Sequence, residues 1–191
     1  MSSRNEPLAK FLWCLIPAAL TLVLDLGSKA LAVKWIDPLE TLELAPFFNL
    51  VLAFNSGAAF SLFAGDGPYQ GLMMSGIAAL SMLPLIWFYR QARSNERGAV
   101  VSLGLVAGGA LGNIVDRLRY KAVVDFLDFH WGPNHWPAFN LADAAICVGL
   151  GSLILFSLKA ARRLSDSPST RRGLKRKKER AASGRVRADK D

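Results

Sequence analysis

Four apolar runs dominate the hydrophobic pattern of this chain, and each approaches the about 20 residues that a helix needs to cross a bilayer. They cover residues 11–33, 68–89, 98–118 and 138–160. Between the first two runs, residues 48–55 (FNLVLAFN) alternate, with Leu50, Leu52 and Phe54 on one face of a predicted strand. The pattern therefore predicts an all-α integral membrane protein with four transmembrane helices and a small β element between helices 1 and 2.

Charge orients the four runs in the membrane. The first run follows basic residues, basic residues separate the second from the third, and basic residues follow the fourth: Arg4, Lys10, Arg90, Arg93, Arg97, Lys159, Arg162 and Arg163. Basic residues favour the cytoplasmic side, so we expect both termini to be cytoplasmic and the β element to be extracytoplasmic. An exposed edge there could hold a peptide by strand addition, or the element could be a small sheet on the membrane surface. The pattern favours neither.

The last part of the chain differs in composition from the rest. From Lys159 onward there are 13 basic and 4 acidic residues, whereas the remainder has 10 basic and 11 acidic. We therefore divide the chain into a four-span membrane domain, 1–163, and a basic, disordered cytoplasmic tail, 164–191. Basic clusters beside a membrane are drawn to anionic lipid, so we expect lipid and not nucleic acid as the tail's partner.

Polar side chains interrupt the apolar runs at one depth, in the outer half of the bilayer. Ionisable groups at membrane depth are costly and mark functional sites. Helical spacing of three or four residues places several pairs of them on common faces. The residues, taken from the first, third and fourth runs, are Asp25, Lys29, Asn113, Asp116, Arg117, Asn140 and Asp143. Their agreement in depth predicts a single site.

Some of these polar residues can be explained by structure alone, without a role in chemistry. Asp25 and Lys29, four residues apart, are best interpreted as a mutually neutralised structural pair. A carboxylate at a helix start is favoured by the helix dipole, but Asn140 is already the natural cap, which leaves Asp143 available for chemistry. Glycines at 104, 108, 109 and 112 permit close approach of neighbouring helices.

Carboxylates are the chemistry that this inventory offers. The sequence contains no Gly-rich phosphate loop, zinc-type His pair or Cys cluster, so we expect no cofactor and no metal. Two close carboxylates in a poorly solvated site share a proton, and one can then accept a proton from water while the other donates one. Carboxylates alone would also suit a proton-coupled transporter or a divalent-metal site.

Five short motifs, in order, resemble those of the lipoprotein signal peptidases (signal peptidase II). They are DLGSK at 25–29, FNSGAAFS at 54–61, GGALGNIVDR at 108–117, VVDF at 123–126 and PAFNLAD at 137–143. Leu26 departs from the family, which often has Gln there. The resemblance implies an inner-membrane aspartyl endopeptidase that removes signal peptides from prolipoproteins by cutting before their diacylglyceryl-modified cysteine. It further implies action at the periplasmic side, on a membrane-embedded substrate, and we expect a monomer.

The same resemblance implies roles for individual residues. Asp125 and Asp143 would be the catalytic pair. Asn55, Gly57, Asn113, Asp116, Arg117, Asn140, Asp25 and Lys29 would bind substrate or support the site. Asp116 remains an alternative to Asp125 as the first catalytic carboxylate. We prefer Asp125, because Arg117 adjoins Asp116 and would hold Asp116 ionised. The main alternative function is a small proton-coupled transporter that uses the same carboxylates.

Overall fold

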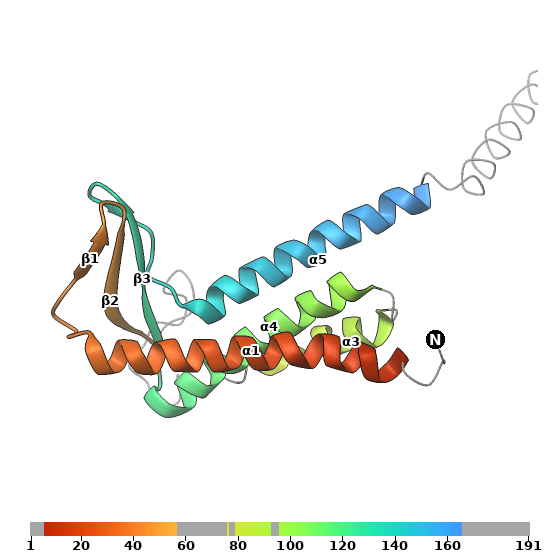
Figure 1. The fold of residues 1–191 in the computed structure, drawn as a ribbon, viewed down its shortest axis with the longest axis horizontal. Helices are drawn as coiled ribbons and strands as arrows, with labels where there is room; N and C mark the ends of the chain where they lie inside the picture. Colours follow the sequence, from red (N-terminus) through yellow and green to blue (C-terminus); the bar gives the residue numbers. More distant parts are fainter. Residues whose placement is uncertain (1–5, 57–75, 77–78, 93–95, 166–191) are drawn as a thin grey trace, which may run out of the picture. The chain divides into compact units, whose positions relative to one another are not determined.

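The structure is a computed structural model that describes residues 6–56, 76, 79–92 and 96–165 (Figure 1). Its elements are, in order, α1 Glu6–Trp35, β1 Leu42–Ala45, β2 Phe48–Asn55, α3 Met82–Gln91, α4 Arg97–Tyr120, β3 Val123–Trp131, β4 Asn134–His135 and α5 Leu141–Ser165. Residues up to Leu153 form one compact unit, and a second unit begins at Ile154. The polar site and the sheet lie in the first unit, and α5 begins in it.

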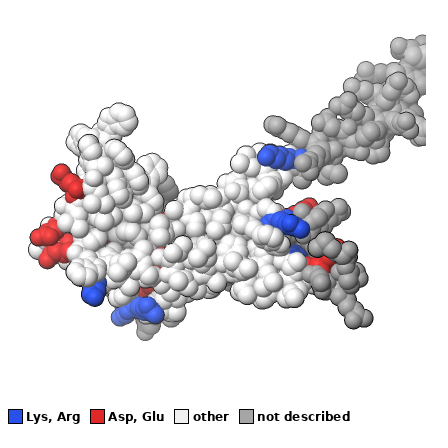
Figure 2. All heavy atoms as spheres, in the orientation of Figure 1, with Lys and Arg blue, Asp and Glu red and all other residues white. Residues whose placement is uncertain are grey.

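Three of the described helices are long and apolar enough to cross a membrane: Glu6–Trp35, Arg97–Tyr120 and Leu141–Lys159. They correspond to the first, third and fourth expected spans. Within the expected span at 68–89, the structure describes residue 76 and residues 79–89, and this part contains most of α3. On the face drawn in Figure 2, the surface over the middle of the helices is free of charged side chains, while acidic atoms gather at the sheet. Such an uncharged band suits hydrocarbon.

Helix α4 lies against both α1 and α5 through its glycines. A side chain at Gly108 would meet the backbone oxygen of Ala18 on α1, and one at Gly109 would meet that of Ala142 on α5. Gly104 likewise lies against Cys14 of α1. The small-residue spacing therefore has the predicted effect, because it lets the three backbones approach closely.

A four-stranded antiparallel sheet in the order β1-β2-β3-β4 caps one end of these helices. Lys121 ends α4 in the left-handed conformation, with φ of 58°, so that β3 begins only two residues later. Strand β3 pairs with β2 across the interval from Phe48↔Phe129 to Asn55↔Val123. This close succession of α4 and β3 brings the end of the helix beside the start of the strand.

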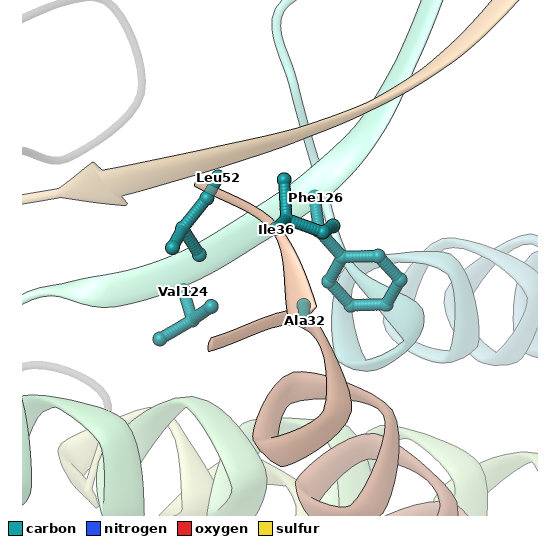
Figure 3. Packing of buried hydrophobic residues seen from close by; sticks show 5 residues of the cluster. All are labelled: Ala32, Ile36, Leu52, Val124 and Phe126. Carbon is teal, nitrogen blue, oxygen red and sulfur yellow. The ribbon is translucent and has the colours of Figure 1, made fainter. Parts of the chain in front are cut away.

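The apolar core at this end joins helix α1 to the sheet. Ala32 and Ile36, at the end of α1, pack with Leu52 of β2 and with Val124 and Phe126 of β3 (Figure 3). Leu50 packs against this cluster. Burial of these side chains fixes the sheet on the helices, and it thereby fixes the position of β3 relative to α1.

The strand expected at 48–55 is confirmed as β2, but its faces differ from the simple alternation. The register shifts between Leu50 and Ala53, so Leu52 is buried whereas Phe54 is exposed and contacts the ring of Tyr120. Leu50, Leu52 and Phe54, which the alternation places on one face of the strand, therefore differ in exposure, and Phe54 is 47% exposed. Strands β1, β3 and β4 were not predicted from the sequence.

Candidate active site

Lys29 lies at the centre of a buried polar cluster where α1 meets α4. Its ammonium nitrogen is 2.8 Å from Asp25 Oδ2 and 2.9 Å from Asp116 Oδ2. It also donates a hydrogen bond of 2.9 Å to Asn113 Oδ1. All four side chains are less than 9% exposed, so the lysine charge is balanced by protein groups and not by water.

Two asparagine amides connect this cluster to two further carboxylates. Asn113 Nδ2 donates to Asp143 Oδ1 at 2.8 Å, and Asn140 Nδ2 donates to Asp125 Oδ1 at 2.7 Å. Asn140 Nδ2 also lies 3.3 Å from Asn113 Oδ1. Asn140 Oδ1 accepts the backbone N–H of Asp143 at 3.0 Å, which makes Asn140 the cap of α5 as predicted. The amides thus join Asp125 on β3 to Asp143 on α5.

Strand β2 and the end of α4 contribute the remaining groups. Asn55 Nδ2 donates to Asp125 Oδ2 at 3.1 Å. The Arg117 guanidinium donates to the backbone oxygen of Asn113 at 3.3 Å, and its charge interacts with Asp143 and Asp125 as well as with Asp116. The site therefore collects side chains from α1, β2, α4, β3 and α5.

Asp125 is placed where a carboxyl group keeps its proton more readily than usual. Burial raises the pKa of Asp125 to about 6, and the negative charge of Asp143 adds to the rise, although amide hydrogen bonds and Lys29 oppose it. Asp125 is buried, with 2% of the residue's surface exposed. Two carboxyl groups that interact in this way titrate as a unit and can share one proton.

The structure brings nine of the ten sequence-predicted residues together, and Gly57 lies outside the described residues. The charge of Arg117 interacts with Asp116, but the closest partner of Asp116 is another residue. Asp116 is engaged, as expected, but its close partner is Lys29 at 2.9 Å, with a further hydrogen bond from the N–H of Val124 at 3.1 Å. Arg117, the partner expected from sequence, turns back to Asn113. The reason is that Lys29 approaches from α1, which adjacency in the sequence cannot reveal.

A second polar cluster was missed by sequence reasoning. Asp128 on β3 accepts a hydrogen bond from Asn49 at 3.0 Å and contacts His135 Nδ1 at 2.9 Å. His130 stacks on His135, with ring centroids 4.9 Å apart. Asn49 and Asp128 are partners in the pairing of β2 with β3. The sequence could have placed them together only if β3 had been recognised as a strand. Within the described part of the chain, no group of three or more His, Cys, Asp or Glu residues is arranged to hold a metal ion.

Comparison with known proteins adds to this geometry. The lipoprotein signal peptidase of Syntrophotalea carbinolica is 44% identical over 149 residues, which cover 78% of this chain and 92% of that protein. That of Ralstonia nicotianae is 43% identical over 142 residues, or 74% and 82% of the two chains. A bacterial membrane enzyme solved by the in meso method aligns with a TM-score of 0.71 at 26% identity, covering 81% of this chain and 92% of that one.

The model of one protein family covers most of the chain. It is described as "Signal peptidase (SPase) II" and matches residues 17–159, a range that contains every residue of the cluster described above. The match begins inside α1 and ends inside α5, so the basic tail lies outside it. The chain belongs to the signal peptidase II family.

Proposed function

We propose that this protein works as an aspartyl endopeptidase, with Asp125 and Asp143 as its two catalytic carboxylates. Family membership makes the chain a bacterial membrane peptidase that removes signal peptides from prolipoproteins. The catalytic class and the residues are our assignment. It rests on one observation: Asp125 and Asp143 interact electrostatically and receive amide donors, whereas Asp116 is paired with a lysine.

The chemistry follows from the different protonation of the two carboxyl groups. Asp125, with its raised pKa of about 6, is the protonated member and donates to the oxygen of the scissile carbonyl. We assign Asp143 the role of the base that accepts a proton from the attacking water. The tetrahedral intermediate then collapses: Asp125 takes back a proton from the hydroxyl group as the C=O bond re-forms, the C–N bond breaks, and the proton held by Asp143 passes to the leaving amine. The products are the signal peptide with a new carboxylate and the lipoprotein with a free amino terminus.

The amides give the carboxylates fixed directions. Asn140 holds one oxygen of Asp125, and Asn113 holds one oxygen of Asp143. The second oxygen of Asp143 is the one we assign to the water. Fixed donors of this kind require no reorganisation during the reaction, which is why they lower its barrier. Asn55 donates to Asp125 from β2. We assign Asn55, and Gly57 two residues after it in the sequence, to substrate binding.

We further propose that residues 68–89 form a membrane span in addition to the three described helices, which makes four spans. Both termini would then lie in the cytoplasm and the site at the periplasmic side. The basic loop and tail support this orientation, because positive charge favours the inner side. The peptidase domain would comprise residues 1–163, and the tail, 164–191, would lie on anionic lipid. The enzyme would act as a monomer and need no nucleic acid.

The substrate is held by its lipid in this proposal. A site level with the outer leaflet can accept acyl chains from the side, and each buried methylene contributes about 0.8 kcal/mol. Anchored chains would hold the scissile bond, just before the diacylglyceryl-modified cysteine, at the depth of Asp125 and Asp143. Anchoring also replaces part of the entropic cost of bringing the peptide to the carboxylates.

A matched pair of preproteins tests this function. One carries the diacylglyceryl cysteine and the other the unmodified cysteine, and both are incubated at equal concentration with purified protein in the same detergent. We expect release of the signal peptide from the first and a much lower kcat/KM for the second. Equal kcat/KM would remove the lipid as a recognition element, and no cleavage of either would reject the peptidase assignment.

The proton-coupled transporter is not favoured. A proton pathway requires ionisable groups along the whole depth of the helices. Among the described residues, the buried charged side chains are Asp25, Lys29, Asp116, Asp125 and Asp128, and all of them lie at the end of the helices that meets the sheet or in the sheet itself.

A further inference from the structure

The two carboxylates that flank Lys29 each reach the backbone beside a catalytic residue. Asp25 Oδ1 accepts the N–H of Ala142 at 2.8 Å, and Ala142 directly precedes Asp143. Asp25 is fully buried, and Gly112 makes room for it, since a side chain at that glycine would meet Asp25 Oδ2. Helix α1 therefore holds the first turn of α5 at the position where Asp143 emerges.

The second carboxylate does the same for the strand. Asp116 Oδ2 accepts the N–H of Val124 at 3.1 Å, and Val124 directly precedes Asp125. The same oxygen lies 2.9 Å from the ammonium nitrogen of Lys29. One cation thus binds two acidic side chains, and these fix the backbone of α5 and of β3 one residue before each catalytic aspartate.

Lys29 also determines which way an amide points. Asn113 Oδ1 accepts from Lys29 at 2.9 Å, which leaves Asn113 Nδ2 to donate to Asp143. Without Lys29, only the longer contact of 3.3 Å from Asn140 Nδ2 would face this oxygen. The amide could then turn more readily and present an oxygen to the Asp143 carboxylate, which is repulsive. The lysine therefore fixes a donor that faces the active site although it does not itself face the substrate.

We propose that Lys29 is a positioning residue, which sets the spacing of the two catalytic carboxylates through the two acidic side chains it binds and also sets the direction of the Asn113 amide. The proposal rests on the assignment of Asp125 and Asp143 as the catalytic pair. It differs from a role as a neutralising counter-charge, because a counter-charge needs only the correct sign. A positioning cation needs the correct sign, length and donor directions.

Two substitutions separate charge from position. Lys29→Arg keeps the charge but replaces a compact ammonium by a larger planar group, so we expect kcat to fall by about 10- to 100-fold with KM nearly unchanged. Lys29→Met removes the charge as well, and we expect a loss of about 100-fold or more. Kinetics would be measured with lipidated preprotein in detergent, and thermal unfolding in the same detergent would report folding.

The pH profile supplies a readout that a loss of stability would not change. Burial and Asp143 raise the pKa of Asp125, and the charge of Lys29 lowers it. The other groups that face Asp125 are Arg117 from α4, Asn55 from β2 and Asn140 before α5. Loss of the lysine charge should therefore move the alkaline limb of kcat/KM to higher pH in Lys29→Met, and the limb should stay in place in Lys29→Arg.

Lys34→Met is the matched control, because Lys34 lies on the same helix, is exposed and stands over the ring of Trp35. It should retain wild-type kcat and pH profile. Wild-type kcat in folded Lys29→Arg would overturn the proposal, since charge alone would then suffice. If Lys29→Met fails to fold, the arginine variant still decides. Failure of the wild-type protein to cleave would instead reject the proposed function, so the two failures are distinguishable.

Discussion

Two aspartates on the same strand, three residues apart, have opposite acid–base character. Asp125 and Asp128 are both nearly buried on β3, at 2% and 5% exposed. Burial raises the pKa of Asp125 to about 6, with Asp143 adding to the rise. Burial also acts to raise the pKa of Asp128, but hydrogen bonds from His135 and Asn49 outweigh it and hold that pKa below its ordinary value.

The difference teaches that burial does not by itself make an aspartate able to share a proton. Asp125 is buried beside another carboxylate, and its amide donors offset only part of the resulting rise in pKa, whereas Asp128 faces a histidine that can carry positive charge. The first arrangement favours the protonated carboxyl group, and the second favours the carboxylate. Only the first suits the acid–base role proposed for this strand.

The largest effect that tests this comparison is expected from Asp→Asn substitutions. Asp125→Asn and Asp143→Asn should each lower kcat by about 100- to 10,000-fold, because each removes one half of the proton exchange. Asp128→Asn should keep most of the activity, since it removes a charge from the same strand without touching the pair. Cleavage of lipidated preprotein, with unfolding temperatures as a control for folding, measures all three.

The choice between Asp125 and Asp116 is decided by the same series. Substantial turnover by Asp125→Asn together with complete loss in Asp116→Asn would move the catalytic assignment to Asp116. A partial loss in Asp116→Asn is compatible with our assignment, because that side chain pairs with Lys29.

An intermediate effect is expected from pH. Because Asp125 must be protonated to donate, kcat/KM should be highest below its pKa of about 6 and fall as pH rises through that value. The fall should approach tenfold per pH unit, since one proton is lost from the pair. A pH–rate profile of the wild type and of Asp128→Asn should show the same limb in both. If the limb in Asp128→Asn lay at a different pH from that of the wild type, the titrating group would be Asp128 and not Asp125.

A smaller effect is expected from His135→Ala. This change removes the partner of Asp128 and the stacking with His130. Because His135 is half exposed, its interaction is screened by solvent, and we expect the free energy of unfolding to fall by about 1 kcal/mol or less. Chemical unfolding in detergent measures this, and kcat should not change. A large fall in kcat would mean that the cluster around Asp128 and His135 affects the position or charge of the catalytic pair.

The smallest effect is expected far from both aspartates. Deletion of residues 168–191 should leave cleavage in detergent largely intact, because we place the tail on the cytoplasmic side, a bilayer thickness of about 30 Å from the site. Kinetics of the full-length and shortened proteins in the same detergent provide the measurement. A marked loss of turnover in correctly folded shortened protein would contradict both the topology and the domain division.

The sequence was sufficient for the parts of the site that depend on local spacing. The pairing of Asp25 with Lys29 and the capping of α5 by Asn140 follow from positions three or four residues apart, and the structure has both. The grouping of the polar residues followed from their common depth along helices of known rise. Strand β2 was found because its alternation is visible in the sequence.

The parts that sequence reasoning missed depend on contacts between distant segments. Strand β3 begins with an apolar run, and without a clean alternation it could not be recognised as a strand. The pairing of Asp116 with Lys29 depends on how α1 and α4 are rotated against each other, which the glycine spacing permits but does not specify. The register shift between Leu50 and Ala53 of β2 has no marker in the sequence.

The Asp25–Lys29 ion pair has a consequence for how the protein enters the membrane. Helix α1 is synthesised before its partners, and its two buried charges lie four residues apart on one face. They can neutralise each other within a single helix, so α1 is able to insert without waiting for α4. In such an order of insertion, α4 would bring Asp116 to a lysine already held by Asp25, and the 2.9 Å contact between Lys29 and Asp116 would form last.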